Sequence, residues 1–452
     1  MIEPLGWAAF GLGLIGTWVL MADRGFRDGM RLAWFVATLA VPAWFTVTFR
    51  SITLDAITGV ISATALALLF RPFEGARTRW VLSDVLVGGI VLAGIVSDAV
   101  NRILIPGTIF ELIRSWVLPY LVGRLFLTSW DQMRRTLPVL VVLAAALSIY
   151  AIVESFSHTN VLAVATGKKW ELLESSEGYR WGLKRAQAIT NHPIYFGLLM
   201  ALTLPWLLTA SRQAARGDGP RWWVAVPALA TAGAFVTVSR SAQLAIVLVF
   251  AADQFFRRPN YRAPMLFLAL AGGLAFLVFR VEVLDLLGMY AGEHAIGQDK
   301  VRIYGVEYDY SGTRHRDLLL LAYEEAIDRA GWFGYGSSVP DMPRDPNMDV
   351  RFLSIDDHYL IQHLRYGYLG TVAFLAFAAA GAWNLAREAL ARDGPLSDLA
   401  AGLFGAFVAV TLMVRGVALS FDFGATWLFV AGLAATMRAR RIPSAAAARK
   451  PD

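Results

Sequence analysis

The residues best suited to chemistry in this 452-residue chain are an acidic cluster with a histidine and four arginines. The cluster Asp356-Asp357-His358 stands immediately before an apolar segment. A carboxylate or an imidazole can accept the proton of a hydroxyl group as its oxygen attacks a carbon atom. Guanidinium groups bind phosphate bidentately and stay charged at any relevant pH, so no metal or other cofactor is required. The arginines are Arg185, Arg240, Arg314 and Arg316.

The composition indicates that membrane-spanning helices must position these residues. Hydrophobic residues make up 57% of the chain and charged residues only 17%, which is too apolar for a soluble protein of this length. There is no cysteine, which excludes disulfides and thiolate chemistry. The net charge of +6 does not indicate a nucleic-acid partner, because most basic residues lie in loops beside apolar runs. The first run, Leu5 to Met21, lacks the flanks of a signal peptide, and we expect a retained span.

The apolar runs predict an all-α, polytopic integral membrane protein. A membrane-spanning helix needs roughly 20 predominantly apolar residues, and about thirteen segments qualify. They are 4–21, 32–49, 55–70, 80–97, 107–127, 137–154, 193–210, 223–238, 242–256, 263–281, 368–386, 399–415 and 421–437.

The basic residues predict the orientation of these spans. One set of alternate short loops, together with the C-terminal tail, holds 21 Lys and Arg residues, and the other set holds four. Loops rich in Lys and Arg stay in the cytoplasm, so we expect the N-terminus outside and the C-terminus inside. The two long polar loops would then face outward. The predicted organisation is 1–281 with ten spans and the outer loop 155–192, the large outer loop 282–366, three spans in 367–437 and the basic tail 438–452.

The large loop contains a predicted amphipathic helix that lies at the membrane surface. Ser311 or Thr313 can cap its start, and Gly331 can end it. Arg314 and Arg316 would lie in its first turn, where cations oppose the helix dipole unless an anion joins them. The structural alternative is a solvated basic helix start.

The other candidates also have structural interpretations. Arg240 lies in a turn so short that it could simply anchor the chain at the interface. Arg114 and Arg124, inside one predicted span, suit helix packing, although intramembrane cations are also functional candidates. His358 could be an interfacial histidine bonded to its acidic neighbours. His315, His358 and His363 have no recognisable metal-ligand spacing, and we expect no metal site.

A series of short motifs occurs in a fixed order between Leu118 and Gly370. They are Pro119-Tyr-Leu-Val-Gly-Arg124, Arg185-(x7)-Pro193-Ile-Tyr-Phe-Gly197, Ser239-Arg240, Arg314/Arg316 followed by Gly334-Tyr-Gly336, and Asp356-Asp-His358-Tyr-Leu360 running into Tyr366-Gly367-Tyr-Leu-Gly370. In this order they resemble the O-antigen ligase and polymerase (Wzy-like) family of bacterial envelopes. Their pattern is closest to the exopolysaccharide polymerases of that family.

The resemblance implies a GT-C-like fold and a metal-independent, inverting glycosyl transfer on the periplasmic side of the bacterial inner membrane. The donor would be an oligosaccharide linked to undecaprenyl diphosphate. The outer-loop arginines would hold the diphosphate, with Arg124 and Tyr359 in support, and a loop histidine would be the base. The implied partners are membrane lipids, a chain-length regulator and a flippase.

The resemblance leaves two questions open. The family's usual His-Asn pair corresponds in register to Asp356, whereas His358 lies two residues later. Because imidazole titrates near neutral pH, we expect His358 to be the base, although register favours Asp356. An aspartate at this place favours polymerisation of repeat units over ligation to another acceptor. A transporter or flippase is the alternative from another class, but transporters place their sites near the midplane, whereas these polar groups gather at one membrane surface.

Overall fold

The computed structural model is mostly helical, with 76% helix and few strands. It describes residues 2–49, 52–70, 79–126, 130–168, 178–279, 300–310, 314–337, 348–349, 352–391 and 394–441. The helices of the first half are α1 (Ile2–Arg24), α2 (Phe26–Leu39), α3 (Ala56–Phe70), α4 (Leu82–Val100), α5 (Pro106–Leu112), η1 (Ile113–Val117), α6 (Leu118–Phe126), α7 (Trp130–Ser157), α8 (Val161–Thr166) and α10 (Pro193–Ala215). Those of the second half are η3 (Arg221–Val224), α11 (Val226–Phe235), α12 (Arg240–Arg257), α13 (Pro259–Val278), α15 (His315–Ala322), α16 (Glu324–Ala330), α17 (His358–Leu390), α18 (Pro395–Met413) and α19 (Phe421–Arg441).

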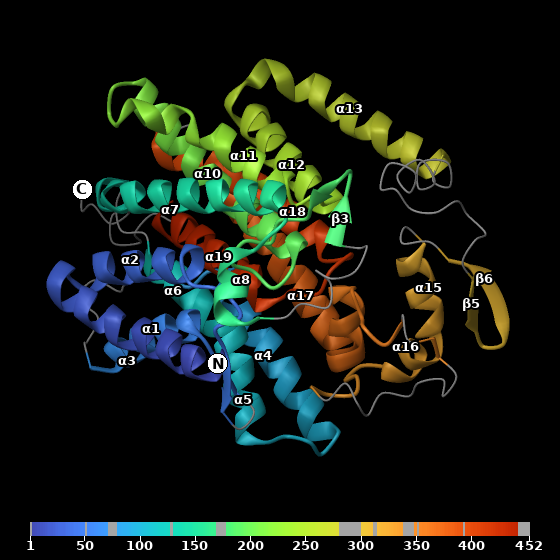
Figure 1. The fold of residues 1–452 in the computed structure, drawn as a ribbon. Helices are drawn as coiled ribbons and strands as arrows, with labels where there is room; N and C mark the ends of the chain where they lie inside the picture. The colour runs from blue at the N-terminus through green and yellow to red at the C-terminus, as the bar shows by residue number, and fades with distance from the viewer. Residues whose placement is uncertain are drawn as a thin grey trace, which may run out of the picture.

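Strands occur only as short antiparallel hairpins in the described residues. They are β1 (Val47–Phe49) with β2 (Ile52–Leu54), β3 (Tyr179–Arg180) with β4 (Leu183–Lys184), and β5 (Lys300–Ile303) with β6 (Val306–Asp309). Figure 1 shows the long helices side by side in one bundle, with β5, β6, α15 and α16 beyond its right-hand end.

Among the described residues, six helices are long and apolar enough to cross a membrane. They are α1, α4, α7, α10, α17 and α18. These apolar helices support the membrane-protein interpretation. A helix also occupies part of every span range expected from the sequence. One expected range, 32–49, is wrong in its second half. The helix there ends at Leu39, since Pro42 cannot donate a backbone hydrogen bond, and the chain continues into β1.

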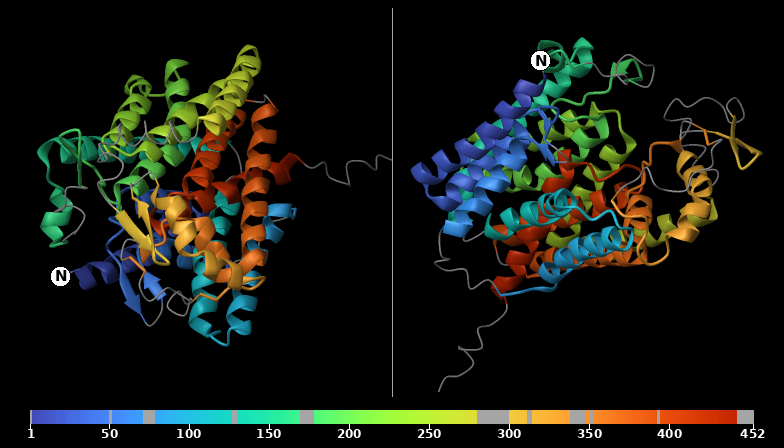
Figure 2. Two further views of the ribbon diagram at one scale, coloured as in Figure 1. Left: turned by 90° about the vertical axis from the view of Figure 1, so that its right-hand side faces the viewer. Right: turned by 90° about the horizontal axis from the view of Figure 1, so that it is seen from below.

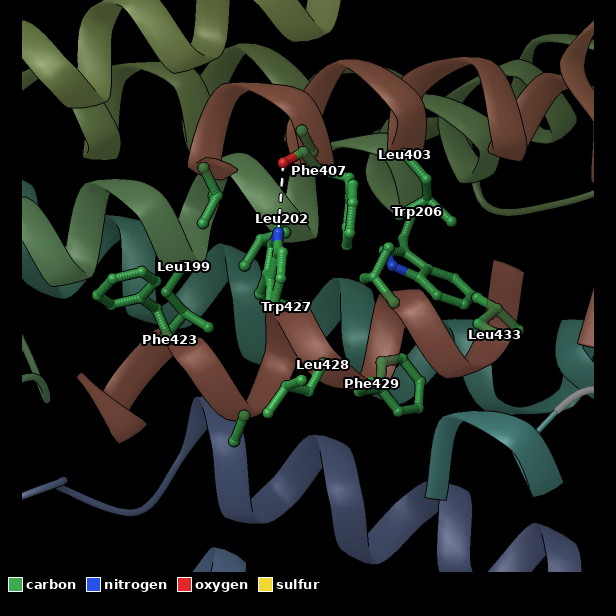
Figure 3. Packing of buried hydrophobic residues seen from close by; sticks show 14 of the residues in the cluster. Leu199, Leu202, Trp206, Leu403, Phe407, Phe423, Trp427, Leu428, Phe429 and Leu433 are labelled. Carbon is green, nitrogen blue, oxygen red and sulfur yellow. Dashed lines mark hydrogen bonds between the residues drawn. The ribbon is translucent and has the colours of Figure 1, made fainter. Parts of the chain in front are cut away.

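The centre of the bundle is a buried aromatic and aliphatic core around α19. Trp427 stacks on Phe407 of α18, with ring centroids 4.7 Å apart, and its indole Nε1 donates to the Phe407 carbonyl at 3.3 Å (Figure 3). Phe429, two residues further along α19, packs edge-on against Phe126 of α6 at 4.7 Å. The helices that carry the polar segments are therefore held by apolar packing from α6, α10, α18 and α19.

The expected span 107–127 is interrupted by a π-helical turn. Pro119 has no N–H group, so the ordinary i to i−4 bond to Ser115 cannot form, and the ladder widens at η1. This turn carries Arg114 and Trp116, both buried. The Arg114 guanidinium binds Glu111 and donates to the Thr58 hydroxyl at 3.0 Å. Arg114 is thus fixed in the helix packing.

Helix α17 is broken at Gly367, and the broken ends pair with the Gly-Tyr-Gly segment. Gly367 has φ 62° and ψ −157°, which removes the helical bonds of Tyr368 and Leu369. Their N–H groups instead donate to the carbonyls of Gly331 and Trp332, at 3.0 and 3.2 Å. The freed carbonyls of α17 accept bonds from Tyr335 N and Gly336 N, both at 2.8 Å.

The large polar loop has its own small core, built onto the start of α17. Residues from β5, α15 and α16 pack with Phe352, Leu360 and Leu364. In Figure 2, left, β5, β6, α15 and α16 lie in front of the bundle. The single surface helix expected up to Gly331 is divided at Tyr323 into α15 and α16. The expected caps at Ser311 and Thr313 lie outside the described residues, and Arg314 is the N-cap of α15.

Substituting Gly367 with alanine is expected to lower the stability of the folded protein. Gly367 lies in the left-handed region, and an added Cβ would overlap the Trp332 carbonyl group. The expected cost is about 1–3 kcal/mol, measured as a lower unfolding temperature in detergent. The matched control is Gly88→Ala in α4, where an added Cβ meets nothing within 4 Å and alanine should be neutral or slightly stabilising. Equal unfolding temperatures for the two variants would contradict this account of the kink.

Candidate active site

The polar segments gather at one end of the bundle, where α10, α12, α17 and α19 begin. Figure 1 shows β3 and the start of α17 at this end. We call it the loop end. Backbone and side-chain hydrogen bonds join its connecting segments to one another. They are Ala186 N to Val236 O (3.0 Å), Asn191 N to Asp422 Oδ2 (2.7 Å) and His358 N to Val414 O (2.8 Å).

Two of the four candidate arginines lie in segments that come together in this junction. Arg185, which follows β4, is buried, and its Nε donates to the Thr237 carbonyl at 3.4 Å. Arg240, three residues after Thr237, is half-buried and starts α12. The tertiary fold therefore brings Arg185 and Arg240 to the same turn, from segments that are far apart in the sequence.

Strained backbone lies beside both arginines. Ala188 and Val238 have φ angles of 50° and 47°, a region that residues with a side chain adopt at a cost. Two buried residues hold Ala188 in this conformation: Glu154 Oε2 accepts its N–H at 2.8 Å, and Asn160 Nδ2 donates to its carbonyl at 2.9 Å. Backbone strain that is held by buried polar groups is a frequent feature of functional sites.

Arg314 and Arg316 approach the loop end from α15. Both are half-buried, and Arg316 Nη2 donates to the Gly416 carbonyl at 3.0 Å, in the α18–α19 connection. A Cβ added at Gly416 would lie 2.6 Å from Arg316 Nη2, so the guanidinium lies close to the backbone there. Arg316 is thus joined to the segment that precedes Asp422, whereas Arg314 stands at the N-cap of α15.

The three residues of the acidic cluster have different surroundings. Asp357 is buried and caps α17, accepting the N–H groups of Tyr359 and Leu360 at 2.9 and 3.1 Å. Burial raises the pKa of the Asp357 carboxyl, against the opposing effects of these bonds and of Arg415 and Arg316. His358 is only 6% exposed. Its ring packs against Trp116 and Phe374, and its Nε2 lies 3.1 Å from Gln362 Nε2.

Asp356 is the accessible member of the cluster. It is exposed, and Ser354 Oγ donates to its Oδ1 at 3.3 Å. It also lies within electrostatic range of the Tyr195 side chain of α10. Accessibility to an incoming hydroxyl group therefore favours Asp356, whereas the expectation that His358 is the base rested on the ordinary pKa of imidazole.

Asp422 also belongs to this junction, although its place in the sequence predicts only the start of a span. Its carboxylate accepts the backbone N–H of Asn191 at 2.7 Å and the Asn191 side-chain amide at 3.2 Å. Asp422 also lines a partly open cavity of about 30 Å³ with Asp55 and Thr190 among apolar side chains, large enough for a water molecule. An acidic residue at the first turn of an apolar helix was the available signal.

The two supporting residues implied by the resemblance, Arg124 and Tyr359, lie in different parts of the structure. Arg124 is not at the loop end: its Nε and Nη2 bind the Asp84 carboxylate at 2.8 and 2.9 Å, near the C-terminal part of α19, where it contacts Thr436. Tyr359 is beside the acidic cluster, but its hydroxyl donates to the Thr411 carbonyl of α18 at 2.6 Å. Both side chains form hydrogen bonds that join packed segments of the bundle.

The histidines considered for a metal site are held apart. His315 stacks on Phe352 at 5.5 Å, and His363 contacts Tyr368 at 4.7 Å, while His358 lies inside the bundle. Across the described ranges, no group of three or more His, Cys, Asp or Glu side chains could hold a metal ion.

No model of a known protein family matches this chain, and no curated protein matches it significantly.

Proposed function

We propose that this chain is a membrane-embedded, inverting glycosyltransferase that joins oligosaccharide units carried on undecaprenyl diphosphate. The observation that carries the proposal is that Arg185 binds the Thr237 carbonyl, three residues before Arg240, at the loop end, where Arg316 and the accessible Asp356 also lie. Phosphate-binding cations beside a carboxylate form the minimal set for transfer of a sugar from a diphosphate to a hydroxyl.

The proposed step needs only these groups and the two substrates. The acceptor hydroxyl oxygen attacks the anomeric carbon of the donor sugar, and the bond from that carbon to the phosphate oxygen breaks. Asp356 takes the hydroxyl proton, and the arginines hold the lipid diphosphate as it leaves with the electron pair. Attack opposite to the leaving group inverts the anomeric configuration.

The proposal includes a GT-C-like fold of about thirteen spans in the bacterial inner membrane, with the N-terminus in the periplasm and the C-terminus in the cytoplasm. Two observations support this orientation. Basic residues are concentrated in alternate loops and in the tail, and the 21-residue helix α19 begins at the loop end and leads away from it toward Arg441. The loop end would then face the periplasm, where the lipid-linked donor is available.

Polymerisation is the favoured form of this reaction, with ligation to a different acceptor as the second. Both use the same donor and would use the same arginines, so the acceptor alone separates them. Membrane lipids, a chain-length regulator and a flippase are the proposed partners. A transporter of the same lipid-linked glycan is disfavoured, because the described centre of the bundle around α19 is apolar (Figure 3) and the arginines gather at one end.

Purified protein in lipid nanodiscs, given a lipid-diphosphate oligosaccharide and nothing else, is expected to form longer lipid-linked chains. Products would be resolved by gel electrophoresis and mass spectrometry. Growth that starts only after a second acceptor is added would identify a ligase. No transfer with any acceptor, together with movement of the labelled lipid between leaflets, would instead identify a transporter.

A further inference from the structure

A partly open cavity of about 410 Å³ lies between the last turns of α17 and α19. The residues that line it are Asn384, Arg387, Glu388, Leu390, Ala391 and Arg438. Both helices begin at the loop end, so their last turns lie at the opposite end of the bundle. Arg387 follows the break at Gly367 by 20 residues, which is about 30 Å at 1.5 Å per residue. The cavity is therefore about one hydrocarbon thickness of a bilayer away from the loop end.

The lining of this cavity is cationic. Arg387 and Arg438 come from different helices, and over the described part of the chain neither forms an ion pair with an acidic side chain. Glu388, the acidic residue of the lining, is buried and already has an interaction partner. Two guanidinium groups that face one cavity without a carboxylate attract an anion, and the oxygens of a phosphate suit their N–H groups.

The border of the cavity has the character of a membrane surface. Trp383 and Leu390 of α17 are exposed, and the Arg387 guanidinium lies over the Trp383 ring, 6.0 Å from its centroid. Tryptophan is enriched at membrane–water interfaces, where an arginine extends its charged group to the level of the lipid phosphates. The inner wall is fixed, because the buried Asn384 donates to Ser83 Oγ of α4 at 3.0 Å. Exposed apolar side chains beside two cations suit a lipid headgroup more than a free ion.

We propose that this cavity binds the phosphate of an anionic membrane phospholipid. Arg387 and Arg438 hold the phosphate, and the start of the acyl chains lies against Trp383 and Leu390. Basic pockets between membrane helices bind lipid headgroups in this way on the cytoplasmic side, which is where the proposed orientation places this end of the bundle. The site goes beyond the proposed function, since it lies away from the loop end and takes no part in glycan transfer.

The test compares the native protein with Arg387→Gln, Arg438→Gln and the double variant, all in detergent. Arg387 is exposed and Arg438 is half-buried, so the variants are expected to keep the native unfolding temperature when no lipid is present. A ligand that binds only the folded state raises the unfolding temperature. Added phosphatidylglycerol is therefore expected to raise it for the native protein and not for the double variant.

The affinity for the lipid is measured with a fluorescent phosphatidylglycerol. Each single variant is expected to bind it roughly tenfold more weakly, because a charge-assisted hydrogen bond to the phosphate is lost. The matched control is Arg258→Gln. Arg258 is exposed at the C-terminus of α12, at the same end of the bundle, and lies over the Tyr261 ring at 5.4 Å, but it is not among the residues that line the cavity. This control is expected to keep the native affinity.

Competition identifies the source of the phosphate. Unlabelled phosphatidylglycerol is expected to displace the fluorescent lipid, whereas phosphatidylcholine, which has no net charge, and inorganic phosphate at the same concentration are not. Displacement by inorganic phosphate as effective as that by the lipid would overturn the lipid assignment. An equal loss of affinity in Arg258→Gln and Arg387→Gln would show a general attraction to positive charge and no defined site. An equal rise in unfolding temperature for the native protein and the double variant, or no rise in either, would refute the site. None of these measurements depends on glycan transfer, so the proposed function can fail while this site stands.

Discussion

Arg240→Lys and Arg185→Lys are each expected to reduce glycan transfer by roughly tenfold to a thousandfold, because a lysine ammonium cannot reproduce the bidentate contact of a guanidinium with phosphate. Arg185 binds the Thr237 carbonyl and Arg240 follows three residues later, so each replacement is expected to weaken the same proposed diphosphate site. Because both variants keep the positive charge, a large loss would indicate geometry and not net charge. Initial rates of chain growth would be compared at saturating donor.

The matched control for these variants is Arg102→Lys, an exposed arginine that follows α4 outside the cluster. It should leave the rate within about twofold of the native value. Arg185 is buried, so its variant must also show the native unfolding temperature and normal membrane insertion before its rate is interpreted. Full activity in a well-folded Arg240→Lys protein would remove Arg240 from the proposed site.

Asp356→Asn is expected to reduce transfer by roughly a hundredfold or more without a change in donor binding. The amide has nearly the shape of the carboxylate but cannot take the acceptor proton. His358→Ala is expected to act mainly on stability. Removal of its buried ring leaves a cavity between Trp116 and Phe374, which should cost about 2–4 kcal/mol. Single-turnover rates, donor affinity and unfolding temperature together distinguish these two effects.

Asp309→Asn is the matched control for Asp356→Asn, since Asp309 is an exposed carboxylate of β6 on the same polar loop. It should keep the native rate. If Asp356→Asn remains active while a well-folded His358→Gln variant is inactive, the base would be His358, and the loop end must open to expose it.

The sequence by itself indicated a helical membrane protein and the approximate positions of its long apolar helices. Long apolar runs have few stable alternatives to a helix, so a helix occupies part of each of the thirteen expected ranges. Prolines account for the places where the helices differ from the expected ranges. Pro42 follows the early end of the 32–49 helix, and Pro119 accompanies the π turn. Neither effect is visible in hydrophobicity alone, because proline acts by removing one backbone donor.

The residue types that can do chemistry were also predictable from the sequence. Their exposure to solvent and their hydrogen-bond partners were not. Asp356, Asp357 and His358 are consecutive in the sequence, yet one is exposed, one caps α17 and one is buried. Burial depends on which distant segments pack over a residue, and no local spacing encodes it. The sequence also does not reveal that Arg124 pairs with Asp84, away from the loop end.

Only the tertiary structure decided which separate motifs act together. The Gly334-Tyr-Gly336 segment and Gly367 both belong to the sequence pattern, but the fold shows that one satisfies the backbone groups freed by the other. Asp422 is bonded to Asn191, and Arg185 is bonded to Thr237, in the same way. Each of these contacts is a hydrogen bond between residues far apart in the chain. The partners of these bonds are close to one another only where apolar packing aligns the helices. The sequence therefore shows which polar groups are present, but not which of them are bonded to each other.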